Sequence, residues 1–360
     1  MKRTRECKHP LACDASSTRA PLTRAPKTAP DASAASGEAS EEASHERLFT
    51  LAPRPSPCRS PRHSCESVNG AQAHTYKMFT LRQVGCNARS MLGSLRQMSA
   101  SAGPLVDVAV DNAGVATVTM QRLPVNSLNL DLLTEMNKTL DDLAKNKTRG
   151  MILTSASPTV FSAGLDIMEM YNPDFKRAET FWNTLQDVWL KLFGSGYPTA
   201  AAINGHAPAG GCLLALSCEY RVMATGKFTI GLNETALGIV APTWFIDSMC
   251  NTISSREAEF ALTTGRMFSV DEALKTGLID ETAADKAGTI EKCRGFIKKF
   301  ERISPMARAA TKQKIREIPL RKLMQNRQKD TEEFLNYLKN PMVQKGLEMY
   351  IASLKQKAKK

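Results

Sequence analysis

The segment Thr199–Cys212, TAAAINGHAPAGGC, joins a run of small apolar residues to a glycine-rich turn. Residues 199–203 predict a buried strand, and residues 210–217 predict a helix. The glycines between them allow a positive φ or a close approach to a neighbouring segment. The segment therefore predicts a strand, a tight turn and a helix, as in an α/β fold.

Strands and helices alternate on both sides of this unit. Residues 106–119 contain two alternating runs around a turn at 111–114, which predicts a β-hairpin. Apolar residues at helical spacing follow at 132–143. The pattern then predicts strands at 151–154 and 220–223 and an aromatic-rich helix at 180–193. This alternation predicts βαβ units on a mainly parallel sheet.

The sequence after Pro242 is almost wholly helical in pattern. The apolar spacing predicts helices at 255–263, 270–276, 290–300, 305–315 and 330–338. We expect this C-terminal third to pack against the core or against a neighbouring subunit. The chain ends in a lysine-rich stretch that predicts a solvated tail and contains Lys355, Lys357, Lys359 and Lys360.

The N-terminal region differs in composition from the rest. Residues 1–77 are dominated by Ala, Ser, Pro and Arg without a sustained apolar period, which predicts disorder. Residues 78–103 carry three Arg and no acidic residue, which is typical of a mitochondrial transit peptide; a basic linker is the alternative. We therefore expect Met78 to be the working initiator, residues 104–300 to form the core and residues 301–360 a helical C-terminal region.

Bulk composition leaves the function open. The chain has 360 residues, of which 42% are hydrophobic, so it has material for a substantial core. Its formal net charge is +12, but seven of the excess positive charges lie in residues 1–103. The remaining excess suits a phosphorylated small ligand as well as it suits RNA.

The cysteines and histidines predict no metal site. The nine cysteines show no paired ligand spacing, and His206 is the single histidine beyond residue 100. No apolar run has the length of a membrane-spanning helix. We expect four cysteines to be reduced thiols in the core: Cys212, Cys218, Cys250 and Cys293.

Two further segments point to chemistry. Residues 161–166, FSAGLD, form a second glycine-bearing loop, and Glu234 lies in residues 230–238, IGLNETALG. Helix N-termini carry unpaired N–H groups and partial positive charge, so two converging ends favour a developing oxyanion. A carboxylate facing a polarised carbonyl moves protons at the neighbouring carbon. Together these segments predict enolate chemistry on an acyl thioester.

These segments, with Pro124–Leu128 and residues 233–242, resemble the enoyl-CoA hydratase/isomerase (crotonase) superfamily over residues 104–355, and most of all its mitochondrial delta isomerases. The resemblance implies a crotonase-like α/β fold, with a ββα spiral core and a helical C-terminal region that makes a homotrimer. It also implies the mitochondrial matrix as the location. Coenzyme A would be part of the substrate, with no separate cofactor.

The resemblance also implies roles for individual residues. The backbone N–H groups of Leu165 and Gly210 would form an oxyanion hole for the thioester oxygen, and Glu234 would be the catalytic carboxylate. The coenzyme A portion of the substrate would be bound by Gly210 and by the matching loop, which consists of Ala163, Gly164, Leu165, Asp166 and Ile167.

Leu213 stands where hydratases of the superfamily carry the first of two glutamates. One carboxylate is enough to take a proton from C2 of a 3-enoyl thioester and return it at C4. The resemblance therefore implies an isomerase that converts 3-cis- or 3-trans-enoyl-CoA to 2-trans-enoyl-CoA in the β-oxidation of unsaturated fatty acids. Hydration of 2-enoyl-CoA is one alternative. RNA binding is the other, although aromatic residues make up only 6% of the chain.

Such a base needs a raised pKa, which apolar neighbours supply by disfavouring the charged form. We expect Leu213, Ile239, Val240 and Trp244 to provide these surroundings for Glu234.

Four other polar or aromatic residues are predicted to have structural roles. His206 is expected to be a loop residue and not a general base. Asp166 is expected to cap the following helix. Trp182 and Trp189 lie seven residues apart on one predicted helix and are expected in the core or in the wall of an acyl pocket.

Overall fold

The computed structural model describes residues 103–359, so the expected disordered extension and transit peptide lie outside the described residues. The described elements, in chain order, are β1 (Val106–Val110), β2 (Val115–Met120), α2 (Leu130–Lys145), β3 (Gly150–Ser155), η1 (Ile167–Glu169), α3 (Phe175–Phe193), β4 (Thr199–Ile203), β5 (Ala207–Pro208), α4 (Gly210–Ser217), β6 (Tyr220–Ala224), β7 (Thr229–Gly231), η2 (Thr235–Leu237), α5 (Thr243–Cys250), α6 (Ser255–Thr264), β8 (Phe268–Ser269), α7 (Val270–Thr276), β9 (Glu281–Ala283), α8 (Lys286–Lys298), α9 (Pro305–Leu338) and α10 (Pro341–Lys359).

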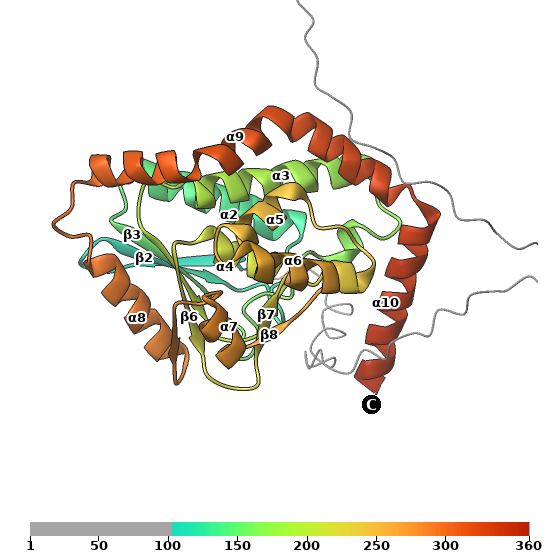
Figure 1. Cartoon of the computed structure of the whole chain (residues 1–360), viewed down its shortest axis with the longest axis horizontal. Helices are drawn as coiled ribbons and strands as arrows, with labels where there is room; N and C mark the ends of the chain where they lie inside the picture. The colour runs from blue at the N-terminus through green and yellow to red at the C-terminus, as the bar shows by residue number, and fades with distance from the viewer. Residues whose placement is uncertain (1–102, 360) are drawn as a thin grey trace, which may run out of the picture. The chain divides into compact units, whose positions relative to one another are not determined.

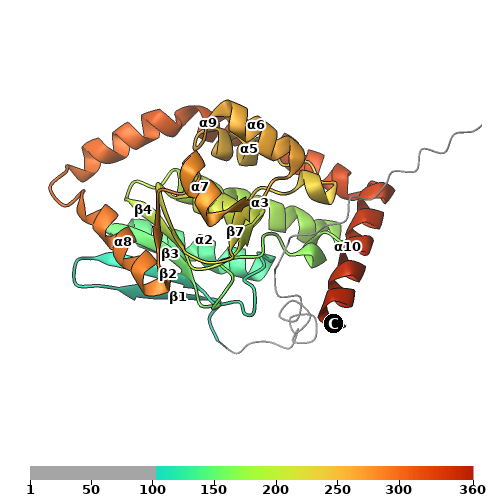
Figure 2. The ribbon, with the colours of Figure 1, turned by 60° about the horizontal axis from the view of Figure 1, so that its bottom comes forward.

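The main sheet has the order β1-β2-β3-β4-β6-β9. The β1–β2 pair is antiparallel, and every other pair in this sheet is parallel, which confirms the predicted hairpin and the mainly parallel sheet. A smaller sheet has the order β5-β7-β8. Its strands β5 and β7 are parallel, and β5 lies in the glycine-rich segment between β4 and α4. Figures 1 and 2 show helices α2 and α3 on one side of the main sheet and α8 on the other.

Apolar side chains fill both faces of the main sheet. On one face Ile297 and Cys293 of α8 pack against strand residues such as Ile152 and Val222. The other face carries the larger core, into which α2 and α3 bury their apolar stripes. Because both faces of the sheet are covered, β3 and β4 are buried throughout. Their sequences therefore lack the polar–apolar alternation of a half-exposed strand.

The C-terminal region forms two helices that differ from the prediction. Residues 305–315 and 330–338 were expected to be separate helices, but α9 is one helix of 34 residues that continues through Pro319. Leu320 and Leu323 are buried in the main core, so tertiary packing holds the helix where the local sequence favours a break. Figure 1 shows α9 running along α3.

The last helix, α10, was not predicted as a separate helix, although it lies within residues 301–360, which were expected to be helical. It spans Pro341–Lys359, so the lysines expected in a solvated tail lie largely within a helix, with the Lys355 side chain exposed. Leu347 of α10 is buried against the main core. The expectation that the C-terminal third packs against the core is confirmed.

The cysteine prediction holds at three of its four positions. Cys212, Cys218 and Cys293 are buried free thiols, but Cys250 is a free thiol on the surface. Cys250 is the last residue of α5 and lies on the exposed side of the helix end, whereas its neighbours Ser248 and Met249 are buried. Among residues 103–359 no helix combines the length and the apolar character needed to cross a bilayer.

Candidate active site

The two glycine-bearing loops predicted from the sequence lie against each other. The Phe161 amide donates to His206 O at 2.9 Å, which joins the first loop to the second. On the other side, Leu128 N donates to Gly164 O at 2.8 Å and Asp166 N donates to Leu128 O at 3.0 Å. These two bonds flank Leu165 and hold its peptide in place.

The backbone amides of Leu165 and Gly210 are neighbours in this arrangement. A Cβ atom built on Gly210 would lie 3.3 Å from Leu165 N, and one built on Gly164 would lie 3.2 Å from Gly210 N. Gly164 has a φ of +88°, which favours glycine. Within residues 103–359 neither amide donates a hydrogen bond to another group. Two free N–H groups therefore lie side by side, one of them at the N-terminus of α4.

Ala209, immediately before α4, has an unusual backbone conformation. Its φ of 49° and ψ of −121° are rarely adopted by a residue with a side chain. The Ala209 amide donates to Gly231 O at 2.8 Å, and Pro208 pairs with Gly231 in the small sheet. The same sheet therefore orients the start of α4 and leads, through β7, to Glu234.

Glu234 is a buried carboxylate without a partner. Its side chain is 7% exposed, and neither carboxylate oxygen has a hydrogen-bond donor in the described part of the chain. Burial raises the pKa of Glu234 to about 7. A group with this pKa can both accept and return a proton near neutral pH.

Glu234 lines a chamber of about 760 Å³. Of the residues predicted to surround Glu234, Ile239 and Val240 line this chamber, whereas Leu213 and Trp244 are buried in the core and do not. The predicted substrate-binding residues that line it are Ala163, Leu165, Asp166 and Ile167. Gly164 and Gly210 do not line it themselves, but they lie in the two loops that form its wall.

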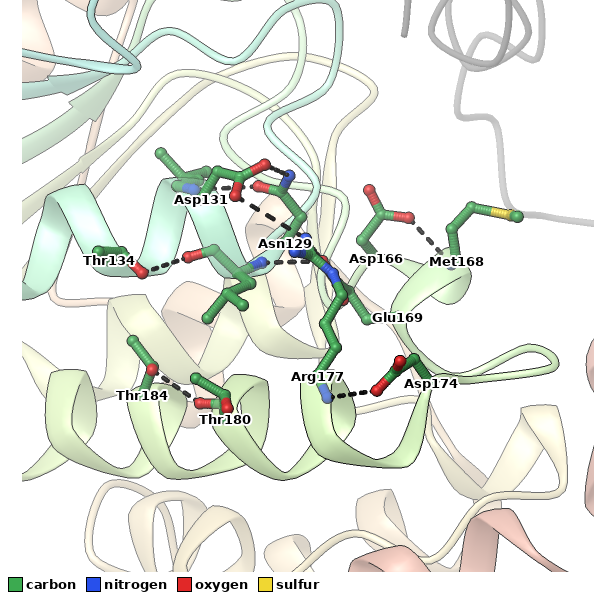
Figure 3. Close-up of polar contacts among 12 residues, drawn as sticks. Asn129, Asp131, Thr134, Asp166, Met168, Glu169, Asp174, Arg177, Thr180 and Thr184 are labelled. Carbon is green, nitrogen blue, oxygen red and sulfur yellow. Dashed lines mark hydrogen bonds and ion pairs between the residues drawn. The ribbon is translucent and has the colours of Figure 1, made fainter.

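Charged side chains cluster in one part of the chamber wall, as Figure 3 shows in part. Asp166 accepts a hydrogen bond from Met168 N at 3.0 Å, which confirms its capping role, and pairs with Arg122 at 2.8 Å. Glu169 accepts two hydrogen bonds from Arg177, at 2.9 and 2.7 Å. Arg122, Glu169 and Arg177 were not predicted from the sequence, because no local motif brings them together.

His206 and the two tryptophans have the structural settings expected of them. His206 is buried, accepts a hydrogen bond from Thr229 N at Nδ1 (3.2 Å) and does not line the chamber. Burial lowers its pKa. Trp182 lines the chamber, and Trp189 lies in the core with its Nε1 donating to Ser248 Oγ at 3.0 Å.

Among residues 103–359, no group of three or more His, Cys, Asp or Glu side chains is arranged to hold a metal ion. Several carboxylates line the chamber, and among the described residues Glu234 is the buried one whose two oxygens have no hydrogen-bond donor.

Known proteins resemble the chain over this same region. Residues 110–359 match the family described as enoyl-CoA hydratase/isomerase. The chain is 46% identical over 247 residues to enoyl-CoA delta isomerase 1, mitochondrial, of Mus musculus, which covers 68% of this chain and 85% of that protein. It is also 30% identical over 192 residues to the 2,3-dehydroadipyl-CoA hydratase of Escherichia coli (strain K12), covering 53% of this chain and 74% of that protein.

A solved structure agrees with the sequence relatives. The crystal structure of human mitochondrial delta3-delta2-enoyl-CoA isomerase superimposes with a TM-score of 0.68 at 40% identity, covering 70% of this chain and 98% of that one. The predicted crotonase-like α/β core with a helical C-terminal region is thereby confirmed. The chain belongs to the enoyl-CoA hydratase/isomerase family.

Proposed function

We propose that the chain is an enoyl-CoA delta isomerase, which moves the double bond of 3-cis- or 3-trans-enoyl-CoA to give 2-trans-enoyl-CoA in the β-oxidation of unsaturated fatty acids. The names of its relatives at 40% identity and above support this activity. The observation that carries the mechanism is the unpartnered, buried carboxylate of Glu234, which lines a chamber beside two free backbone amides.

The two amides act on the thioester oxygen. In the proposed complex, the N–H groups of Leu165 and Gly210 donate to this oxygen and stabilise the negative charge that develops on it. One such donor contributes roughly 3–4 kcal/mol to lowering the barrier. The side chain of Leu165 has no part in this role, because the donor is the backbone.

Glu234 carries the proton. Its carboxylate takes the proton from C2 of the 3-enoyl thioester, and the electrons of the broken C–H bond pass into a dienolate held by the two amides. The protonated Glu234 then gives the same proton to C4, and the double bond comes to lie between C2 and C3. The carboxylate is restored, and the step consumes neither water nor a cofactor.

Hydration is the main alternative, because the E. coli relative is named a hydratase. Activating water in that reaction would use a second carboxylate, and residue 213, where the resemblance places it, is a buried leucine. Asp166 and Glu169 also line the chamber, but each is engaged by an arginine. Asp330 lines it as well, where the side chains of Trp182, Gln186 and Trp244 hold one of its oxygens. These contacts favour isomerisation over hydration.

The substrate site and the assembly are also part of the proposal. Residues 163–167 would hold the coenzyme A portion, with no separate cofactor. The relatives are named mitochondrial, and we place this chain in the mitochondrion, specifically in the matrix, as a homotrimer. Import of the full chain into isolated mitochondria, followed by protease protection after rupture of the outer membrane, tests the location. Sedimentation of the purified chain tests the trimer, and a filter-binding assay tests the expected lack of nucleic-acid affinity.

The activity is tested with two substrates. The full chain is supplied with 3-trans-enoyl-CoA and, separately, with 2-trans-enoyl-CoA, and the ultraviolet absorbance of the conjugated enoyl thioester is followed. We expect a rise with the first substrate and no loss with the second. Loss with the second substrate would establish hydration, and no change with either would contradict catalysis on these thioesters.

A further inference from the structure

The carboxylate of Asp330, which lines the chamber, accepts hydrogen bonds from three uncharged side chains of the core. Asp330 Oδ2 accepts hydrogen bonds from Trp182 Nε1 at 2.7 Å, Gln186 Nε2 at 2.8 Å and Trp244 Nε1 at 3.3 Å. The two indoles are 4% and 2% exposed, and Gln186 is fully buried. Three donors from α3 and α5 therefore fix one oxygen of a residue on α9.

The second oxygen of Asp330 has a different environment. In the described part of the chain Oδ1 receives no hydrogen bond, and no Lys, Arg or His nitrogen lies within 4.0 Å of the carboxylate. Asp330 lines both the chamber and a second cavity of about 270 Å³, and Thr243 and Glu333 are likewise shared. Asp330 thus stands in the wall between two cavities, with one oxygen free to bind water or a ligand.

Asp330 has an aromatic cluster on one side of it in the chamber wall, and Thr243 and Glu333 on the side that is shared with the second cavity. Phe334, one helical turn further along α9, stacks on Trp182 with ring centroids 3.9 Å apart. Phe245 packs edge-on against Trp244 at 4.6 Å. Trp182, Phe245 and Phe334 all line the chamber, and their contacts are separate from the charged cluster around Asp166 and Glu169. This aromatic wall suits a hydrocarbon chain, and Asp330 is where its apolar character ends.

We propose that Asp330 determines substrate specificity by ending the apolar part of the chamber. It limits the length of a methyl-ended acyl chain and accepts a hydrogen bond from a hydroxyl at the distal end of a chain that reaches it. The inference rests on the proposed function, in which the aromatic wall takes the acyl chain. A methyl group that reaches Oδ1 displaces water without replacing its hydrogen bond, whereas a hydroxyl replaces it.

The test measures binding without turnover. Saturated acyl-CoA thioesters of increasing length are titrated into the full chain, and the fluorescence of its three tryptophans, two of which bind Asp330, reports occupancy of the aromatic wall. We expect the Kd to fall by about tenfold for each two carbons added, until the chain reaches Asp330, and then to rise. At the first length that binds more weakly, a terminal hydroxyl should lower the Kd by about tenfold.

The variant Asp330→Asn removes the charge and keeps an oxygen that can accept from the indoles. We expect it to shift the optimum by at least one two-carbon step and to reduce the gain from the hydroxyl to about threefold or less. The control Asp141→Asn removes an α2 carboxylate that also pairs with α3, through Lys191 at 2.7 Å, but lies outside the chamber; its length profile should match that of the unmodified chain.

Two results would overturn the inference: a length profile without a turning point, or a turning point at which the terminal hydroxyl gives no gain. The second result would mean that the limit is purely steric, and it needs no variant to be observed. Failure of the proposed function is distinguishable, because a chain that shows the length and hydroxyl dependence but no rise of absorbance with 3-trans-enoyl-CoA would bind acyl thioesters without isomerising them.

Discussion

Two glutamates of this protein are removed from solvent in opposite ways. Glu234 is 7% exposed and has no hydrogen-bond donor among the described residues. Glu219, 17% exposed, pairs with Arg308 and with Lys312, the latter at 3.0 Å, and accepts a hydrogen bond from Thr199 N at 3.0 Å. Burial raises the pKa of Glu234 to about 7; at Glu219 burial acts in the same direction, but the two cations outweigh it and lower the pKa.

The difference separates a reactive carboxylate from a structural one. Arg308 and Lys312 belong to α9, so Glu219 ties that helix to the start of β6. A carboxylate held by two cations has little tendency to take up a proton near neutral pH. The unpartnered Glu234 keeps this tendency, at the expense of stability.

Replacing the reactive carboxylate should abolish turnover. Glu234→Gln keeps the size of the side chain but removes the base, so we expect kcat on 3-trans-enoyl-CoA to fall by about 10⁴-fold with KM nearly unchanged. The absorbance assay measures both quantities. The matched control, Glu179→Gln, changes an exposed glutamate of α3 and should leave kcat within about twofold. Retained activity in Glu234→Gln would rule out Glu234 as the base.

Replacing the structural carboxylate should instead destabilise the fold. Glu219→Ala leaves Lys312, which is 6% exposed, and Arg308 without their counter-charge, so we expect a loss of about 3–5 kcal/mol in the free energy of unfolding at pH 7.5. Urea denaturation of the full chain measures this loss. The control Glu317→Gln breaks an exposed pair with Arg321 on the same helix and should cost about 0.5 kcal/mol or less. A similar loss in both variants would contradict the buried network.

The two glutamates should also give stability opposite dependence on pH. The pKa of Glu234 is raised on folding, so the native state binds the extra proton between about pH 4.5 and 7 and loses stability as the pH rises through this window. Glu234→Gln should therefore be about 3 kcal/mol more stable, relative to the unmodified chain, at pH 8 than at pH 4.

Glu219 has the opposite sign. Its folded pKa is lowered, so its contribution is present above the unfolded pKa of about 4.5 and is lost as the pH falls. The destabilisation caused by Glu219→Ala should shrink in acid. Urea titrations of the three chains across pH 4 to 8 would show whether the two differences run in opposite directions, and parallel curves would remove the distinction between the residues.

The smallest expected effect is on the pH dependence of catalysis. Because Glu234 must be ionised to accept the C2 proton, kcat/KM should fall by about tenfold for each pH unit below about 7. The absorbance assay across pH 5 to 9 measures this limb. An inflection near the ordinary glutamate pKa would show that burial does not tune Glu234. Glu317→Gln, which leaves the chamber intact, should keep the inflection where it is.

The local sequence predicted much of the fold because its signals are short-range. The hairpin at 106–120, the strand at 199–203 and the helix at 210–217 follow from side-chain period and turn residues, and the structure confirms them. The prediction failed where packing outweighs local preference. Pro319 favours a helix break, yet α9 continues because Leu320 and Leu323 are buried.

The candidate site likewise contains residues that the sequence predicted and residues that it did not. The FSAGLD loop, the turn before α4 and Glu234 were found from the sequence, because glycine loops and a following acidic residue form contiguous motifs. The Arg122–Asp166 pair and the contacts of Asp330 with Trp182 and Trp244 were not found, since these partners lie between 44 and 148 residues apart in the chain. No local pattern specifies which distant side chains will meet.

Local sequence patterns were enough to predict the family, the alternation of strands and helices, and the residue types available for catalysis. The folded structure was needed to show that Glu234 is buried without a hydrogen-bond donor among the described residues, that Glu219 lies between two cations, and that Asp330 ends an aromatic wall. The physical reason is that the pKa of a carboxylate and the ligand it accepts depend on solvent exclusion and on neighbouring charges, which come from segments that only folding brings together.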